Sequence, residues 1–332
     1  MKIALIGPGI MSIPPSGWGA VEILIWDYYN ELTKLGHQVK IINKIRKEPN
    51  EQSNPFTPYC QELIKEINAE NYDFAHLHYD CLYHILPYLT AKKIGITSHY
   101  PYIDNVQKHQ GDGFTPILNF FLQNNNKVLN FMLAKKDIDF LEQKGANKNL
   151  LFLLENGINS TRFKCHSKNE NELGNKTIYL GQVNERKRQN IYCNLNNIDI
   201  IGPNGTKQMK NYKGSWSRND VESKLTEYGN LLLLSKGEAD PLVVKEALMC
   251  GLGVVVNATS SKNLINDSNT DDFITIIADE KIEDLSYIQT KIDENREKSL
   301  LVRDKIREYA ERNFGWIVFI EKYINNITNI TN

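Results

Sequence analysis

Two glutamates eight positions apart, Glu238 and Glu246, are the side chains of this sequence whose spacing most strongly suggests shared chemistry. The leucine run 231–234 precedes them and the apolar run 250–256 follows them, an order that predicts strand, loop, helix and strand. Glu238 is then expected in the loop at the carboxyl end of a strand, and Glu246 about one and a half turns into the helix. Ligands of open α/β sheets bind at that edge. The two carboxylates could therefore contact different parts of one polar ligand.

The start of the predicted helix offers an anion site between these carboxylates. Pro241 suits the first helical position because it has no N–H to leave unpaired. The amides of Leu242 and Val243 are then expected to point out of the helix end, where the helix dipole favours a phosphate. This arrangement suits a sugar linked to a diphosphate. The spacing alone is equally compatible with two structural charges, one in the loop and one on an exposed helix face.

Histidines and an aspartate follow two predicted strands in the first half of the chain. His78 and Asp80 come at the end of the strand 74–77, and alternation places His76 on the same face as His78. His99 ends the next strand. Such side chains could bind zinc, bond sugar hydroxyls or transfer protons. No cysteine or further carboxylate lies nearby, which disfavours a metal, and one of the histidines could simply be a core residue.

A glycine-rich segment separates the first predicted strand from a helix. It runs from Gly7 to Ala20 and contains Gly17, Trp18 and Gly19. A turn of this kind can hold phosphate with backbone amides. It is not the dinucleotide fingerprint, because the third glycine is missing, so NAD is disfavoured. A plain surface turn is the alternative.

A cluster of three cations follows the first strand of the second half, in the segment that begins Gly181-Gln182. Arg186, Lys187 and Arg188 lie at an expected strand-to-helix turn. The positive end of a helix disfavours cations unless an anion binds there. This local conflict favours a phosphate ligand over an exposed basic helix start.

The elements that must position these groups alternate between strands and helices. In the first half, a helix is predicted over 21–35, and strands are predicted at 3–6, 39–42, 74–77, 94–97, 128–132 and 150–154. In the second half, helices are predicted within 280–312 and at 316–327, and strands at 177–180, 198–201, 231–234, 254–256 and 274–277. Apolar strands separated by helices indicate parallel sheets covered on both faces. We therefore predict an α/β protein with a Rossmann-like, doubly wound N-terminal domain (1–155), a similar C-terminal domain (156–312) and a C-terminal helix and tail (313–332).

Composition limits the function classes. The 332 residues are 41% apolar, and 39 basic and 40 acidic side chains give a net charge of −1, so neither disorder nor a nucleic-acid partner is expected. The five cysteines are dispersed, which is typical of reduced thiols in the cytoplasm. The first apolar run is too short for a signal peptide, and no run approaches a membrane span. Lys44 to Lys47 could at most contact the inner membrane face.

Taken together, these residues resemble the family-4 glycosyltransferases, which are retaining enzymes with the GT-B fold. The resemblance runs through most of the chain. It rests on the segment Pro15 to Glu22, on His78 and Asp80, on His99, on Asn156 to Phe163, on Gly181 to Lys187, and on Glu238 and Glu246, which match the family's EX7E motif.

The resemblance implies two Rossmann-like domains that face each other across a cleft, with the C-terminal helix returning to the N-terminal domain. It also implies a UDP- or GDP-linked sugar as donor, with no cofactor and no metal. Glu246 would bond the ribose, and other groups would hold the diphosphate. The donor-binding residues so implied are Gly17, Trp18, Gly19, Gln182, Lys187, Arg188, Leu242, Val243 and Glu246.

The same resemblance implies how transfer would occur. Glu238 and His99 would be the catalytic residues, with Glu238 stabilising the positive charge of the transferred sugar and His99 lying beside it. His78 and Asp80 would bind the acceptor, a hydroxyl of a glycan, a lipid or another molecule. Attack on the front face of the donor, as is usually proposed for this family, would retain the anomeric configuration, and the protein would be a hexosyl- or related glycosyltransferase.

Two departures from the family pattern define the alternatives. Gln182 replaces the arginine that the family has after Gly181, which removes one fixed cation from the leaving group. Pro241 replaces a glycine but keeps the amides that follow it. A module that binds a nucleotide sugar with weak or no catalysis is therefore the second hypothesis. A related GT-B phosphorylase or a nucleotide-sugar epimerase is the third.

Overall fold

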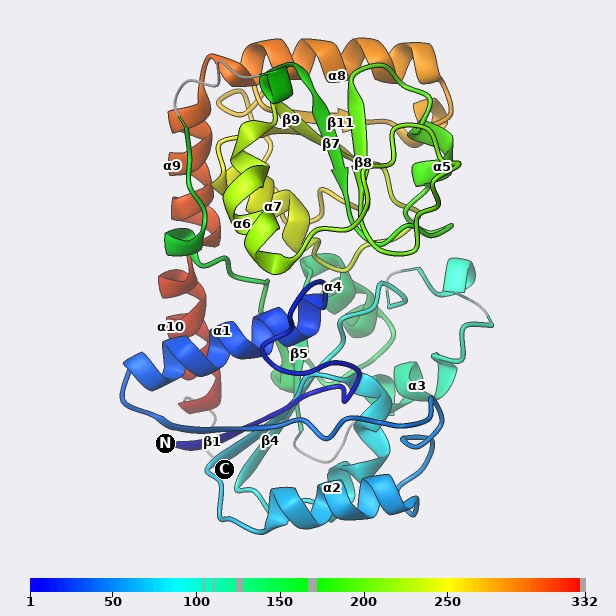
Figure 1. Cartoon of the computed structure of the whole chain (residues 1–332). Coiled ribbons are helices and arrows are strands. Elements are labelled where there is room, and N and C mark those ends of the chain that lie inside the picture. The colour runs from blue at the N-terminus through cyan, green and yellow to red at the C-terminus, as the bar shows by residue number, and fades with distance from the viewer. Residues whose placement is uncertain (104, 110, 124–127, 167–171, 329–332) are drawn as a thin grey trace. The chain divides into compact units, whose positions relative to one another are not determined.

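The computed structural model describes residues 1–103, 105–109, 111–123, 128–166 and 172–328 (Figure 1). The chain divides into two compact units. The first comprises 1–15, 19–156 and 317–332, and the second comprises 16–18 and 157–316. The domain limits given above stay a prediction, because compactness alone does not establish independent folding. The end of the predicted tail, 329–332, lies outside the described residues.

The first unit is built on six parallel strands in the order β2-β1-β3-β4-β5-β6. The order reverses between β1 and β3, so the loops at their carboxyl ends diverge and leave room for a ligand at that edge. The strand bounds are β1 Lys2–Ile6, β2 Gln38–Ile42, β3 Phe74–Leu77, β4 Lys93–Thr97, β5 Leu129–Met132 and β6 Leu151–Leu153.

Helices connect these strands and cover the sheet. Thr57 caps α2 by accepting a hydrogen bond from the amide of Cys60 at 3.2 Å, and Pro58 occupies its first turn. The helical segments are α1 Ala20–Lys34, α2 Pro58–Asn68, η1 Asp80–Tyr88, η2 Val106–His109, α3 Thr115–Gln123, α4 Lys135–Gln143 and η3 Lys148–Leu150.

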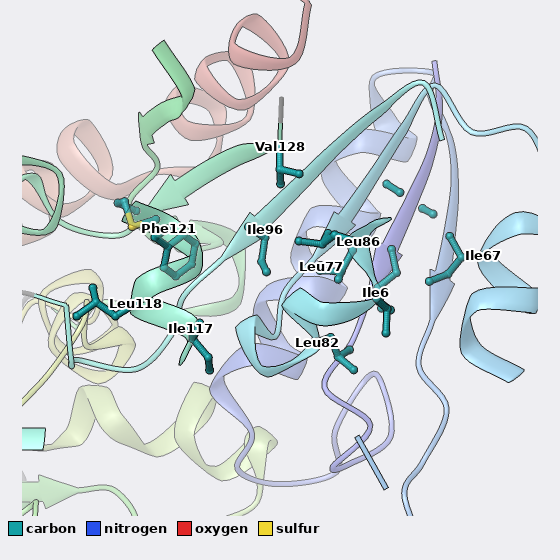
Figure 2. Close-up of a cluster of buried hydrophobic side chains, with 14 of the residues drawn as sticks. Ile6, Ile67, Leu77, Leu82, Leu86, Ile96, Ile117, Leu118, Phe121 and Val128 are labelled. Atoms are coloured by element: carbon teal, nitrogen blue, oxygen red, sulfur yellow. The ribbon is translucent and has the colours of Figure 1, made fainter. Parts of the chain in front are cut away.

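The core of the first unit joins the sheet to the segments that carry its polar strand ends. Figure 2 shows Leu77 and Ile96 from neighbouring strands beside Leu82 of η1, with Ile117 and Phe121 of α3 in the same cluster. All of these side chains are buried. Because η1 follows β3 directly and is fixed by this apolar packing, the residues at the β3–η1 junction are held in place.

The C-terminal helix α10, Trp316–Thr328, is tied to the first unit, as predicted. The hydroxyl of Tyr323 lies 2.9 Å from Nδ1 of His76, and both side chains are buried. Lys322 pairs with Glu155 at 2.8 Å, and Lys93 donates to the carbonyl of Ile327 at 2.8 Å. The last helix thus completes a unit that begins more than 300 residues earlier in the chain.

The second unit has five parallel strands in the order β11-β10-β9-β7-β8. Its order reverses between β7 and β9, which places the loops after these two strands at the switch point. The strand bounds are β7 Thr177–Leu180, β8 Ile198–Ile201, β9 Asn230–Leu233, β10 Gly253–Asn257 and β11 Ile274–Ile277.

The helical segments of the second unit include two long ones in the charged stretch that the sequence predicted to be helical. They are η4 Ser160–Arg162, η5 Glu172–Asn175, α5 Gln189–Tyr192, α6 Arg218–Lys224, η6 Leu225–Glu227, α7 Leu242–Met249, η7 Asp279–Lys281, α8 Leu285–Leu300 and α9 Arg303–Phe314. Ser217 and Asp220 form a capping box at the start of α6.

Two arginines of α9 fix the carboxyl end of α7. Arg303 is buried and donates to the carbonyl of Cys250 at 3.0 Å, and Arg307 donates to the carbonyl of Met249 at 2.6 Å. Cations favour a helix C-terminus because its last carbonyls have no partners within the helix. These bonds hold the helix that carries Glu246.

Replacing Tyr323 with phenylalanine tests the attachment of α10. The Tyr323→Phe change keeps the ring but removes the partner of a buried histidine nitrogen, and we expect the free energy of unfolding to fall by about 1–3 kcal/mol. Urea unfolding measures the change. Tyr88→Phe, on an exposed ring, is the matched control and should change little. Equal midpoints for the two variants would show that the His76 contact does not hold the helix.

Candidate functional site

The loops after β7 and β9 are bound to each other at the switch point of the second sheet. The amide of Lys236 donates to the carbonyl of Arg186 at 2.8 Å, and the Ser235 hydroxyl donates to the same carbonyl at 3.2 Å. Asn257, at the end of β10, donates to the carbonyl of Ser235 at 2.8 Å. These hydrogen bonds join the ends of three strands. They also hold in place residues 235 and 236, from which the segment with Glu238 continues.

Glu238 lies in this loop with its carboxylate against two cations. Its Oε1 is 2.7 Å from Nζ of Lys187 and 3.1 Å from a guanidinium nitrogen of Arg186. Burial by itself would raise the pKa of Glu238, but Lys187 and Arg186 bring it below its usual value. Burial lowers the pKa of Lys187, and Glu238 opposes that shift. The carboxylate is therefore ionised at neutral pH and bound to both cations.

The loop that carries these cations is ordered by side-chain hydrogen bonds. The Tyr179 hydroxyl donates to the carbonyl of Lys187, and Asn184 accepts from the amide of Lys187 at 2.9 Å. The side-chain amide of Gln189 donates from Nε2 to the carbonyls of Gly181 at 3.3 Å and Gln182 at 3.0 Å. The positive charges of this turn repel one another, and these hydrogen bonds from neutral groups hold the turn in one conformation.

The three cations lie in the turn between β7 and α5 and not within the helix. The helix α5 begins at Gln189, so Arg186 and Lys187 lie in the loop and not in a first helical turn. Arg188 adopts a left-handed conformation at the N-cap, with φ of 59°. One of its guanidinium nitrogens, NH1, is buried and has no hydrogen-bond partner in the described part of the chain. Arg186 and Lys187 therefore precede the helix, and Arg188 at its N-cap has a buried donor without a partner among the described residues.

The start of α7 is one residue later than the sequence suggested. Pro241 is the N-cap, with ψ of 108°, and the first helical residue is Leu242. The prediction of proline at the first helical position is wrong because this extended ψ lies outside the helical range. The amides of Leu242 and Val243 still belong to the first turn, which has no acceptors within the helix. The proposed anion site keeps its two donors.

Glu246, four residues further along α7, is bound by an arginine that the sequence analysis did not identify. Arg218 donates from NH1 to Oε1 of Glu246 at 2.6 Å and from Nε to Glu222 at 2.8 Å. Its guanidinium lies 5.2 Å from the centre of the Phe163 ring. A cation as the first residue of a helix conflicts with the helix dipole. The same signal that marked Arg186 to Arg188 could therefore have found Arg218.

A second buried ion pair lies between the two glutamates, in residues that the sequence analysis also left unassigned. Asp240 and Lys245 are 2.6 Å apart, and each side chain is 1% exposed. The ammonium of Lys245 also lies 5.0 Å from the centre of the Phe314 ring. The pair joins the Glu238 loop to α7 and sets the position of Glu238 relative to Glu246.

In the first unit, His76 is a core residue, one of the alternatives considered above. Its Nε2 is 2.7 Å from the Thr97 hydroxyl, and its Nδ1 bonds Tyr323. His78 differs, because both of its ring nitrogens are buried without a hydrogen-bond partner among the described residues. The His78 ring centre lies 4.0 Å from that of His76 and 5.7 Å from that of His99. His78 and His99 thus form a stack at the ends of β3 and β4.

The three histidines are neutral at physiological pH. Burial holds the pKa of His76 and of His78 well below the usual value, with nearby histidines adding to the effect. Burial lowers the pKa of His99 to about 4. Neutral imidazoles bind by hydrogen bonds and not by charge. This edge of the first sheet therefore suits uncharged polar groups.

Asp80 lies at the same edge and is itself buried. Its Oδ2 accepts a hydrogen bond from the Tyr102 hydroxyl at 2.7 Å. Burial raises the pKa of Asp80. Since Asp80 is 3% exposed and His78 is 1% exposed, a ligand has little direct access to either in this unit. Their assignment to the acceptor stays a prediction.

The glycine-rich segment ends at the start of α1. Gly19 is the N-cap, with φ of 132°, a conformation that favours glycine. Its carbonyl accepts the amide of Ile23 at 2.9 Å, and Trp18 is exposed. The assignment of Gly17, Trp18 and Gly19 to the diphosphate stays a prediction.

The described part of the chain contains neither a metal-binding cluster nor a membrane-spanning helix. No group of three or more histidine, cysteine, aspartate or glutamate side chains is placed to hold a metal ion. No described helix is both long enough and apolar enough to cross a membrane.

Two Rossmann-like units with parallel sheets give the chain the GT-B fold, as the resemblance implied. No protein-family model and no curated protein matches the sequence. Similar solved structures include HepE from Anabaena in complex with UDP-glucose, at 12% identity and a TM-score of 0.72, covering 99% of this chain and 100% of that one. Sucrose-phosphate synthase from Thermosynechococcus elongatus aligns at 13% identity and a TM-score of 0.76, covering 98% of each chain. The glycosyltransferase WaaG, involved in lipopolysaccharide biosynthesis, aligns at 16% identity and a TM-score of 0.70, covering 99% of this chain and 100% of that one.

Removing one partner of the buried Asp240–Lys245 ion pair should destabilise the second unit. We expect Lys245→Met to lower the free energy of unfolding by about 3–5 kcal/mol, because it leaves the buried Asp240 without its ammonium partner. The double variant Asp240→Leu/Lys245→Met should recover most of that loss. Denaturant unfolding of the single and double variants measures the coupling. Additive losses would show that the two side chains do not interact.

Acid should destabilise the first unit through its neutral histidines. Their folded pKa values lie below the unfolded value of 6.5, so the unfolded state binds protons first as the pH falls. For His99 this stability is complete above pH 6.5 and is lost towards about pH 4, by up to about 1.4 kcal/mol per pH unit. Unfolding measured between pH 8 and pH 5 should give a shallower slope for His99→Gln than for wild type. The exposed His166→Gln should keep the wild-type slope, and equal slopes for all three proteins would contradict the assignment.

Proposed function

We propose that this protein is a glycosyltransferase that moves a sugar from a UDP- or GDP-linked donor to a hydroxyl acceptor, with retention of configuration and without a metal. The observation that carries the proposal is the contact of Glu238 with Lys187 and Arg186 at the switch point of the second sheet. Glu238 itself lies eight residues before Glu246. Carboxylates and cations alternate there as a sugar diphosphate requires.

The cations serve the leaving group. A departing nucleoside diphosphate carries negative charge, which Lys187 and Arg186 offset at short range in a buried setting. The diphosphate competes with Glu238 for these cations and leaves the carboxylate to face the sugar. There Glu238 stabilises the positive charge that develops as the glycosidic bond breaks. The amides of Leu242 and Val243 complete the anion site with the 17–19 loop, Gln182 and Arg188.

Glu246 binds the ribose of the donor. Arg218 holds Oε1 of Glu246, and the proposal assigns Oε2 to the ribose hydroxyls. Arg218 is therefore a positioning residue, since it fixes the carboxylate without touching the ribose. A charge-assisted bond of this kind restricts the rotamer of Glu246 before the donor arrives.

The first unit serves the acceptor. His99 lies beside the transferred sugar, and His78 and Asp80 belong to the acceptor side. Neutral histidines suit a hydroxyl substrate better than a charged one. Solved structures of the same fold support this assignment of substrates, since HepE is described with UDP-glucose and also with UDP and glucose. The dispersed free cysteines support a cytoplasmic location.

A second candidate function is a module that binds a nucleotide sugar with little catalysis. Gln182 stands where the family has an arginine, and both Lys187 and Arg186 are bound to Glu238. Less positive charge is then available for the leaving group. Stabilisation by UDP or GDP without turnover over a broad acceptor panel would favour this candidate.

Paired substitutions at one edge test the proposal. We expect Glu238→Gln and Lys187→Met to lower turnover of the active donor by about 10²–10³-fold, the usual cost of losing one charge-stabilising group. Glu185→Gln and Lys236→Met break an exposed ion pair of the same two loops and should keep wild-type rates. The measurement is nucleotide release from UDP- and GDP-sugars in the presence of hydroxyl acceptors.

The pattern of rates separates the remaining alternatives. Equal rates in all four variants and wild type would show that the site lies elsewhere. Product formed only with inorganic phosphate would indicate a phosphorylase, and an altered donor sugar formed without acceptor would indicate an epimerase.

A further inference from the structure

A cavity in the first unit is lined by residues other than those assigned to the donor. Its volume is about 320 Å³, at the lower end of the usual range for small-molecule sites. The apolar part of its wall includes Tyr102, Phe114 and Leu118, and the polar part consists of Gln107, His109 and Thr115. The cavity is formed by η2, the first residues of α3 and the segment after β4.

The aromatic wall of this cavity is rigid. The rings of Tyr102 and Phe114 are stacked with centres 4.5 Å apart and an interplanar angle of 11°. Tyr100 stacks on Phe114 at 4.6 Å and 17°. A stack of three rings costs little further entropy when a ligand binds, because its rotamers are already fixed by packing.

His109 gives the cavity a directed hydrogen-bonding group. Its side chain is 10% exposed, and its Nδ1 is 2.8 Å from Oδ2 of Asp112. A carboxylate can only accept, so this contact places a proton on Nδ1, and in the neutral imidazole Nε2 is then an acceptor. Nε2 is buried and has no hydrogen-bond partner among the described residues. A buried acceptor without a partner costs free energy, which a ligand hydroxyl would recover.

The cavity is linked to the acceptor residues that the sequence singled out. Tyr102 lines the cavity and also donates its hydroxyl to Asp80 at 2.7 Å. Asp80 is itself almost inaccessible, but through Tyr102 it fixes one wall of an accessible site. Asp80 then acts as a positioning residue rather than as a direct contact.

The lining selects among classes of ligand. It combines aromatic and aliphatic surface with an amide, an imidazole and a hydroxyl, which matches the C–H faces and hydroxyls of a sugar ring. The described lining residues include no lysine or arginine, so a phosphate or an anionic headgroup finds no cation there. The volume limits the bound part to a single ring.

We propose that this cavity is the subsite for a neutral sugar ring of the acceptor and that Nε2 of His109 accepts a hydrogen bond from one of its hydroxyls. This proposal rests on the proposed glycosyltransferase function, because a sugar ring bound here is an acceptor only if the protein transfers sugars. Binding at the cavity does not itself require a donor and can be measured without one.

Saturation-transfer difference NMR on the full chain without nucleotide tests the subsite. The probes are methyl α-D-glucopyranoside, methyl α-D-galactopyranoside and methyl α-D-mannopyranoside, with glycerol 1-phosphate as an anionic comparison. Thr115→Trp places bulk at the exposed rim of the cavity. Ser286→Trp, an equally exposed first-turn residue of α8 in the second unit, is the matched control. Thermal unfolding checks that each variant is folded.

We expect at least one glycoside to give a signal with wild type and Ser286→Trp, and none with Thr115→Trp. His109→Leu should weaken its affinity at least about tenfold, whereas His109→Gln, which keeps an acceptor oxygen, should recover part of the loss. No glycoside signal with wild type, an unchanged signal in Thr115→Trp, or binding of glycerol 1-phosphate alone would overturn the proposal. Failure of nucleotide release with intact glycoside binding would count against the glycosyltransferase function and not against the subsite.

Discussion

Parallel strands covered on both faces confine polar chemistry to their ends, and both candidate sites follow from this constraint. Each of the strands β3 and β9 has four residues, and all of them are buried. His78 and Asp80 follow the end of β3, and Glu238 follows the end of β9. A charge placed within such a strand would have no water and few partners. At a switch point, by contrast, the loops diverge and side chains from two strands can meet. The Lys187–Glu238 contact joins the loops after β7 and β9 in this way.

Three buried carboxylates of the second unit are each paired with a cation. Glu238 is bound by Lys187 and Arg186, Glu246 by Arg218, and Asp240 by Lys245. Buried ions are tolerated only when they are paired in this way. On the proposed function, a diphosphate would compete with Glu238 for Lys187 and Arg186. In that proposal, the exchange would couple donor binding to the position of Glu238, because an anion that takes the cations also alters the field around the carboxylate.

The first unit offers a different environment. Its strand-end histidines are neutral because burial penalises the imidazolium, and its cavity presents one oriented imidazole nitrogen and no described cation. Charged groups would gain little there, whereas hydroxyls would find acceptors. The two units thus separate anion chemistry from hydroxyl chemistry, which agrees with a division between donor and acceptor. Asp80 contributes to that second environment through Tyr102 and not by contact with solvent.

Local patterns in the sequence determined the fold class, most strand positions and the edges at which polar residues gather, because apolar periodicity and strand-to-helix order depend on neighbouring residues. The spacing of Glu238 and Glu246 and the cations before α5 indicated one edge of the second sheet for the same reason. The partners within the site could not be predicted in this way. Arg218 lies 28 residues from Glu246, and Tyr323 lies 247 residues from His76. Whether a buried carboxylate meets a cation, or a histidine nitrogen has a partner, depends on which distant segments pack together, and only the tertiary structure fixes that packing.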